Sequence, residues 1–266
     1  MSTLDTTLRI FPRLHAPRSW RLVERNIASS RGAWLVFVSG FFEPLFYLFA
    51  MGVGVGALVG TVDVNGEAVG YREFVAPALL AASAMNGAVY ESGNVFFKLK
   101  YAKTYDGVLA TPMTVRDVAL GELTYTLIRG TVYSIGFVTV MLAMGLLESP
   151  WALLAIPSAL LVSAAFAAPS VFGTTLMRSW ADFAFVELCT LPMFLFSATF
   201  VPADTYPDVV RWILPLTPLY HGVELLRAFT LGNVSWLVLV NIAYLLAMTG
   251  VFLVLADRRL AKLLLK

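Results

Sequence analysis

The chain has 266 residues, of which 59% are hydrophobic and only 14% are charged. Because soluble domains carry roughly 25% charged residues, this composition excludes a water-soluble globular protein and indicates an integral membrane protein. The formal net charge of +2 taken whole points to no class of partner. The single cysteine, Cys189, excludes an intrachain disulfide and is expected to pack as a small apolar side chain.

Arginines and a tryptophan mark the N-terminal region at residues 17–31. Arg18, Arg21 and Arg25 recur at spacings of three and four beside Trp20. This pattern is typical of a helix that lies in the membrane interface, although a merely basic cytoplasmic tail would also carry it. We predict an interfacial helix here.

Six apolar segments follow, each near the length of about 20 residues that crosses a bilayer core of about 30 Å. We therefore predict an all-α membrane protein with six transmembrane helices in one domain, residues 1–266. Within it we expect a tail and interfacial helix over residues 1–31, a six-span bundle over 33–256 and a basic tail over 257–266. The predicted spans are residues 33–58, 74–97, 117–145, 151–177, 182–200 and 235–256.

The basic residues orient this bundle. Most of the 19 Lys and Arg lie in the segments that face the same side as the termini, whereas the opposite segments hold only Arg72, Arg211 and Arg227. Since cytoplasmic loops carry the excess of Lys and Arg, both termini are predicted to face the cytoplasm, across the plasma membrane.

The loop between spans two and three, residues 98–117, is the longest basic and polar interruption. Tyr101, Tyr105, Val108 and Leu109 fall on one face of a short helix. Such a helix is either a docking surface or a solvated loop on the lipid headgroups, and spacing alone does not decide.

Two signals bound that helix on its C-terminal side. Pro112 is expected to stop it, because the residue before a proline avoids the helical conformation. Thr114 and Asp117, three residues apart, predict the capping box that starts the next helix.

The segment 201–234 is too apolar for a free loop and too rich in proline to span. We predict a re-entrant pair of short helices, over residues 206–214 and 219–229, covered by protein. His221 and Glu224 lie three apart on the second of them, but two ligands without a third do not make a metal site. No metal is expected.

Ionisable residues within spans are costly and are candidates for function. Glu43 and Arg129 lie at similar depths, so a pair between them is geometrically possible. Glu187 lies in span five. These charges either hold the bundle together, or contact substrate, or form the proton relay of an ion-coupled secondary transporter.

The first span carries Gly52, Gly56 and Gly60 in a doubled G-x-x-x-G pattern. This spacing predicts close packing against another helix, of the same chain or of a second copy. The chain has no G-x-x-x-x-G-K-[ST] motif for a nucleoside triphosphate. It offers no convincing nucleophile or metal set either, so we do not expect an enzyme.

Three motifs in this order resemble ABC-2-type exporter permeases, including those that export nodulation factors and the daunorubicin-type drug exporters. They are FFEPLFYLFAMGVGVG (residues 41–56), YDGVLATPMTVRDVALGE (105–122) and the run from TFVPADTYP to PLYHGVELLRAF (199–229). The resemblance covers nearly the whole chain.

The resemblance implies a membrane subunit without a cofactor of its own. Two permeases, identical or related, would form a path for a drug, lipid or lipid-linked saccharide, and two separate P-loop ATPases would bind ATP and Mg²⁺. It implies no nucleic acid.

The resemblance also assigns roles to three segments. Residues 18–31 would be the interfacial connecting helix. Residues 101–110 would be the coupling helix in a cleft of the ATPase, with Tyr101, Lys103, Tyr105, Asp106, Val108 and Leu109 as contacts. Residues 206–229 would be an outer gate that includes Pro215, Pro218, His221, Glu224 and Arg227.

Overall fold

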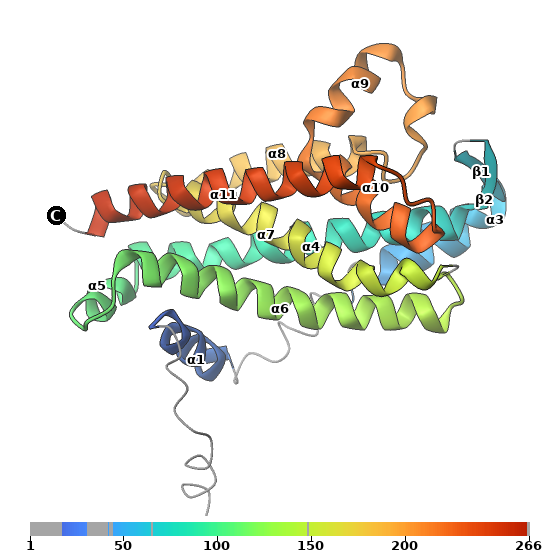
Figure 1. Cartoon of the computed structure of the whole chain (residues 1–266). Helices are drawn as coiled ribbons and strands as arrows, with labels where there is room; N and C mark the ends of the chain where they lie inside the picture. The colour runs from blue at the N-terminus through green and yellow to red at the C-terminus, as the bar shows by residue number, and fades with distance from the viewer. Residues whose placement is uncertain (1–17, 31–41, 43–44, 65, 148, 265–266) are drawn as a thin grey trace, which may run out of the picture.

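The computed structural model describes residues 18–30, 42, 45–64, 66–147 and 149–264. Four long helices lie side by side in it (Figure 1). They are α4 (Tyr71–Lys100), α6 (Val115–Ala143), α7 (Ala155–Thr174) and α11 (Leu237–Leu264). α4, α6 and α11 all contact α7, so α7 is the centre of the bundle.

Shorter elements surround these four helices. α1 (Ser19–Ser30) lies against α6, and α10 (Pro218–Leu231) packs on α4, α7 and α11. An apolar helix over Leu45–Val59 contains a π-helical stretch, η3 (Leu48–Val55), and ends in α3 (Gly56–Val59). The remaining elements are β1 (Thr61–Val64), β2 (Glu67–Gly70), α5 (Thr104–Leu109), η4 (Pro150–Leu154), η5 (Trp180–Asp182), α8 (Phe183–Phe196), η6 (Ala203–Thr205), α9 (Asp208–Ile213) and η7 (Leu214–Leu216).

Small residues bring the helices close together. An added Cβ at Gly222 of α10 would lie 2.8 Å from the Val162 side chain of α7. At Gly121 of α6 it would lie 2.9 Å from the carbonyl oxygen of Ser19, so glycine is what allows α1 to dock there. The buried core between α4 and α7 likewise consists largely of alanines: Ala81, Ala84, Ala88, Ala155, Ala159 and Ala165.

Three helices in the described part of the chain are long and apolar enough to cross a membrane: Val115–Ala143, Pro150–Thr174 and Leu237–Leu264. They correspond to the third, fourth and sixth predicted spans. The second span is α4, which carries charges at both ends, and the fifth is α8, which has only 14 residues. Part of the first span lies outside the described residues. The predicted all-α membrane class is therefore confirmed, and the number six stays a prediction.

A β-hairpin joins the Leu45–Val59 helix to α4 and was not predicted. β1 and β2 pair antiparallel, with Val62 opposite Val69 and Val64 opposite Glu67. Gly66 has a φ of +88°, and its N–H donates to Oδ1 of Asp63 at 2.8 Å. The sequence signal was present, because Asn-Gly between alternating apolar residues is a strong hairpin signature.

The two ends of the bundle differ in character. At one end lie α5 and the C-terminal end of α11, and at the other lie the hairpin and the end of α10 (Figure 1). We call these the α5 end and the hairpin end. Basic side chains gather at the α5 end: Lys98, Lys100, Lys103, Arg116, Arg258, Arg259 and Lys262.

Candidate functional site

The loop between α4 and α6 folds into one short helix. α5 spans Thr104–Leu109, which is shorter than the predicted 101–110, so Tyr101 and Lys103 precede it. Lys103 is its N-cap and has left-handed backbone angles, with φ at 46°. The helix ends before Pro112, as predicted.

The start of α6 is held by the predicted capping box. The N–H of Asp117 donates to Oγ1 of Thr114 at 3.2 Å, and the N–H of Thr114 donates to Oδ2 of Asp117 at 2.8 Å. Nη1 of Arg18 also donates to the carbonyl oxygen of Pro112 at 2.9 Å. The loop between α5 and α6 is thereby joined to the beginning of α1.

Four elements meet at the carboxylate of Glu122, two turns into α6. This carboxylate is almost fully buried, with 1% of the residue exposed. It accepts from Nδ2 of Asn26 in α1 at 3.0 Å, from Nζ of Lys98 in α4 at 2.9 Å and from the hydroxyl of Tyr105 in α5 at 3.0 Å. Nζ of Lys98 also donates to Oδ1 of Asn26 at 3.1 Å. We call these four residues the Glu122 cluster.

Tyr105 lies on the opposite side of α5 from the one predicted. It was expected to contact a partner, but its ring is buried, with 1% exposed, among Leu22 and Val118. Val108 and Leu109 are partly buried against the same core. The apolar face of α5 is therefore its inner face. Burial, followed by the charge and hydrogen bond of Glu122, raises the pKa of Tyr105 well above its ordinary value, so the hydroxyl remains a donor.

The outer side of this loop is formed by Tyr101, Lys103 and Asp106, all exposed. We call them the α5 surface. The Tyr101 ring stacks on Trp180 with centroids 6.2 Å apart and on Phe97 at 6.1 Å. This stacking fixes the exposed tyrosine and links the loop to η5.

The N-terminal region forms a helix, α1, over Ser19–Ser30, and its place in the membrane interface stays a prediction. Leu22, Val23 and Asn26 face α6 and are buried. The predicted interfacial residues Arg18, Trp20, Arg21 and Arg25 are all exposed. Nothing marked Asn26 beforehand except its place on the same helical face as Leu22 and Val23.

Arg129 in α6 pairs with Glu91 of α4. Its Nη1 donates to Oε2 of Glu91 in α4, and its Nε donates to the hydroxyl of Tyr133 at 3.1 Å. Both charged side chains are nearly buried. The proposed partner Glu43 lies outside the described residues, so a pair between Glu43 and Arg129 stays a prediction. Glu91, on the face of α4 toward α6, was not predicted as a partner of Arg129.

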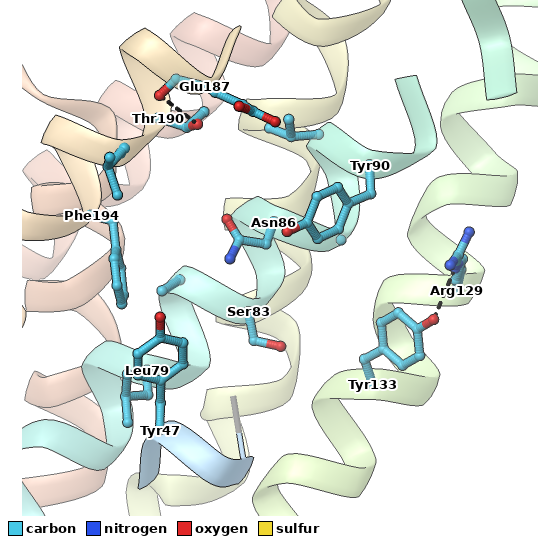
Figure 2. A pocket seen from close by; sticks show the side chains of 14 residues that line it. Tyr47, Leu79, Ser83, Asn86, Tyr90, Arg129, Tyr133, Glu187, Thr190 and Phe194 are labelled. Atoms are coloured by element: carbon cyan, nitrogen blue, oxygen red, sulfur yellow. Dashed lines mark hydrogen bonds between the residues drawn. The ribbon is translucent and has the colours of Figure 1, made fainter. Parts of the chain in front are cut away.

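Beside this pair lies a cavity of about 270 Å³. Ser83, Asn86 and Tyr90 line it from α4, Tyr47 from the Leu45–Val59 helix, and Glu187, Thr190 and Phe194 from α8 (Figure 2). Arg129 and Tyr133 reach it from α6 (Figure 2). Glu187 and Arg129 thus line one cavity, whose walls mix hydroxyl, amide, carboxylate and aromatic groups.

The hairpin end has its own charged centre in α10. Arg227 is 5% exposed and donates through Nη2 to the carbonyl oxygen of Ala198 at 2.9 Å and through Nη1 to Oε1 of Glu224 at 2.7 Å. Its guanidinium lies 3.9 Å from the centroid of the Phe74 ring. Arg227 therefore joins α10 to α4 and to the segment after α8.

His221 of α10 is fully engaged with its own chain. Its Nδ1 lies 2.7 Å from Oδ1 of Asn241, and its Nε2 lies 2.8 Å from the carbonyl oxygen of Pro215. The ring stacks on Tyr244 with centroids 3.9 Å apart. Pro218 is the first residue of α10, where its missing N–H costs nothing.

Two of the three glycines predicted for helix packing contact α4. An added Cβ at Gly52 or Gly56 would meet the Arg72 side chain at 3.7 Å or 3.5 Å, and Nε of Arg72 donates to the carbonyl oxygen of Gly52 at 3.1 Å. Gly60 makes no such contact within the described residues of this chain: it follows α3 with φ at +72°, and an added Cβ there would meet nothing within 4 Å. It turns the chain into β1, and its packing against a second copy stays a prediction.

Comparison with known proteins identifies the family. Residues 18–231 match the family described as ABC-2 type transporter. Nodulation protein J of Sinorhizobium fredii (strain NBRC 101917 / NGR234) is 32% identical over 215 residues, covering 79% of this chain and 80% of that protein. Nodulation protein J of Rhizobium leguminosarum bv. trifolii is 31% identical over 217 residues, covering 80% of each. The resemblance predicted from three motifs is confirmed, and the chain belongs to the ABC-2 type transporter family.

Proposed function

We propose that this chain is the membrane-spanning permease subunit of an ATP-driven exporter for a hydrophobic or amphipathic cargo. Its membership of the ABC-2 type transporter family supports a transport role. The observation that carries the proposal is the Glu122 cluster, in which one buried carboxylate joins α5 to α1, α4 and α6. A displacement of α5 would therefore act through this carboxylate on three other helices, α1, α4 and α6.

In this proposal two separate P-loop ATPases supply the energy, with ATP and Mg²⁺ bound on them. Each contacts the α5 surface, whose Lys103 and Asp106 offer opposite charges beside the fixed ring of Tyr101. The basic residues gathered at the α5 end support a cytoplasmic location for that end and for both termini, in the plasma membrane. α1 then lies along the headgroups with Trp20 and its arginines facing outward.

A second permease, identical or related, would pair with this chain. Six spans from each of the two subunits would then form the path. The cavity between α4, α6, α8 and the Leu45–Val59 helix supports a cargo with both polar and apolar parts. A drug, a lipid or a lipid-linked saccharide meets that description. Segments α9 and α10, with Pro215, Pro218, His221, Glu224 and Arg227, would form the outer gate.

Photo-crosslinking from the α5 surface tests the docking role. A benzophenone amino acid in place of Asp106 should crosslink, in native membranes, to a protein that carries a P-loop. The same group in place of Trp212, an exposed residue of α9, is the matched control and should not. Equal crosslinking from both positions to such an ATPase would count against docking at α5.

Mutation of the α5 surface provides a second test of the docking role. Lys103→Glu combined with Asp106→Arg should reduce co-purification of the ATPase without a large change in the thermal stability of the permease, because both side chains are exposed. Full retention of the ATPase would contradict the proposal. Changes at Tyr105 or Leu109 would disturb buried contacts and would not separate docking from folding.

Transport assays separate this function from an ion-coupled secondary transporter. In sealed vesicles, cargo movement should require ATP and should survive collapse of the proton gradient. Movement that continues without ATP and stops when the gradient is collapsed would favour a relay through Glu187 and Arg129, which line one cavity.

A further inference from the structure

A second and larger cavity, of about 610 Å³, lies on the other face of α8. The face of α8 with Glu187, Leu191 and Phe194 lines the first cavity, whereas the face with Phe185, Cys189 and Met193 lines the second. We call the second cavity the α7–α8 groove, since α7 forms its opposite wall with Phe166, Pro169 and Gly173. It plays no part in the proposed transport path.

The chemistry of the groove changes along its length. Its walls are apolar over most of the distance, and the hydroxyl of Thr190 is already donated to the carbonyl oxygen of Val186 at 3.0 Å. Charged groups occur only where the loop between α7 and α8 closes one end, with Arg178 and Asp182. The groove is thus an apolar slot with one polar mouth.

The mouth carries an available positive charge. Arg178 is exposed, and within the described residues its guanidinium makes no hydrogen bond or ion pair. The carboxylate of Asp182 accepts instead from the backbone N–H groups of Arg178 at 2.6 Å and Ser179 at 3.2 Å. Trp180, half exposed beside them, is a residue type enriched at the level of lipid headgroups.

The length of the slot matches one leaflet. From Phe185 to Met193 along α8 is roughly 12 Å at 1.5 Å per residue, and half of a bilayer core is about 15 Å. Its volume falls within the range of about 300–1,000 Å³ that is usual for ligand pockets. A single extended hydrocarbon chain anchored at the mouth fits these dimensions.

We propose that the α7–α8 groove binds one acyl chain of a membrane phospholipid, with the phosphate held at the mouth by Arg178. The site belongs to the leaflet at the α5 end. The lipid is a bound component of the subunit, independent of the cargo path and of the ATPase, so it can be tested without either.

Gly173 provides a direct way to block the groove. An added Cβ at Gly173 meets nothing within 4 Å, so Gly173→Leu places a side chain into the slot without a clash. Gly250 of α11 is the matched control, because it is also a helical glycine with open space around its Cβ and does not line the groove.

The experiment uses the full chain in nanodiscs of phosphatidylcholine that contain a small fraction of a phosphatidylglycerol with a diazirine in one acyl chain. After irradiation, label should appear on peptides covering residues 166–177 and 185–193, should be lost in Gly173→Leu and should persist in Gly250→Leu. Equal labelling of the wild type and Gly173→Leu, or equal loss in both variants, would overturn the proposal.

Arg178→Gln tests the headgroup contact and remains informative even where Gly173→Leu fails to fold. At limiting probe it should lower the labelling about fivefold, the effect of one basic residue near a charged lipid surface. Unchanged labelling would overturn the assignment to a phospholipid.

The single cysteine tests whether a second copy of the chain, and not a lipid, occupies the groove. Cys189 lines the groove and is exposed. Efficient disulfide crosslinking between Cys189 of two copies in the same nanodiscs would place protein in the slot and overturn lipid binding. Only monomer after oxidation is the expected result.

Discussion

The two ends of the bundle each contain a buried charged residue, but they use it in opposite ways. At the α5 end the anion Glu122 collects three side chains, from α1, α4 and α5. At the hairpin end the cation Arg227 donates to backbone carbonyls, including that of Ala198, and covers the Phe74 ring. Glu122 joins different helices through side chains only, whereas Arg227, besides its ion pair with Glu224 of the same helix, joins other segments through their backbone carbonyls.

The difference indicates which end can rearrange. Asn26, Lys98 and Tyr105 can each leave Glu122 by a change of rotamer while their helices remain intact. Arg227 cannot leave the Ala198 carbonyl without exposing a buried acceptor fixed in the main chain, which is costly. We expect the α5 end to transmit motion and the hairpin end to hold the helices in place.

The largest expected effect is at Glu122. Glu122→Gln leaves the ammonium of Lys98, mostly buried, without its counter-charge, and should destabilise the protein by about 3–5 kcal/mol. The double variant Lys98→Met/Glu122→Gln should recover more than half of that loss, because no unpaired charge remains and the amide oxygen can still accept from Tyr105 and Asn26. Unfolding free energies in detergent measure both. A double variant worse than Glu122→Gln would show that the pair is not the source of the cost.

Arg227→Lys should come next, at about 2–3 kcal/mol, because an ammonium cannot reproduce the hydrogen bonds of the guanidinium fork. The readout that distinguishes the two ends is association with the ATPase. It should be unchanged in Arg227→Lys once the protein is folded. Loss of association at a temperature where the variant is folded would mean that the hairpin end also takes part in coupling.

Tyr105→Phe removes one hydroxyl and keeps the buried ring. It should cost about 1.5 kcal/mol, the lower range for a hydrogen bond to a charged group. The raised pKa of Tyr105 gives a pH test. Its contribution to stability should be complete below the ordinary value of 10.0 and lost as pH rises through the raised pKa. In Tyr105→Phe that loss at alkaline pH should disappear; an identical pH profile in both proteins would contradict it.

The smallest effects concern the two non-glycine residues that have left-handed backbone within the described part of the chain, one at each end. Lys103→Gly should stabilise the protein by up to about 1 kcal/mol through relief of strain at an exposed position. Ala198→Gly should gain less, since it also removes a fully buried methyl group worth about 0.8 kcal/mol. A larger gain at Ala198 than at Lys103 would reverse this ranking.

Local signals predicted the elements well. Thr114 and Asp117 predicted the start of α6, Pro112 predicted that α5 would end before it, and apolar length predicted the long helices. These signals act within a few residues, so the sequence carries them directly. The hairpin at Gly66 was equally readable and was overlooked.

The direction in which a side chain faces across the bundle was harder to predict. The apolar stripe of α5 was clear, but periodicity does not say whether Tyr105 faces a partner or the protein itself. The chain buries that stripe against its own Leu22 and Val118, and the contact with Leu22 joins residues far apart in sequence, which local periodicity does not encode. The contact of Arg129 with Glu91 likewise depends on how α4 and α6 are rotated against each other, which the sequence does not state.

The contacts of Arg227 also have a consequence for biosynthesis. This residue lies 153 positions after Phe74 and 29 after Ala198. Because a chain emerges from the ribosome from its N-terminus, the contacts of Arg227 with α4 can form only after most of the polypeptide has been made. The helices made early are joined by other contacts, among them the Glu91–Arg129 and Lys98–Glu122 pairs between α4 and α6, and Arg227 then binds to an assembly that already exists.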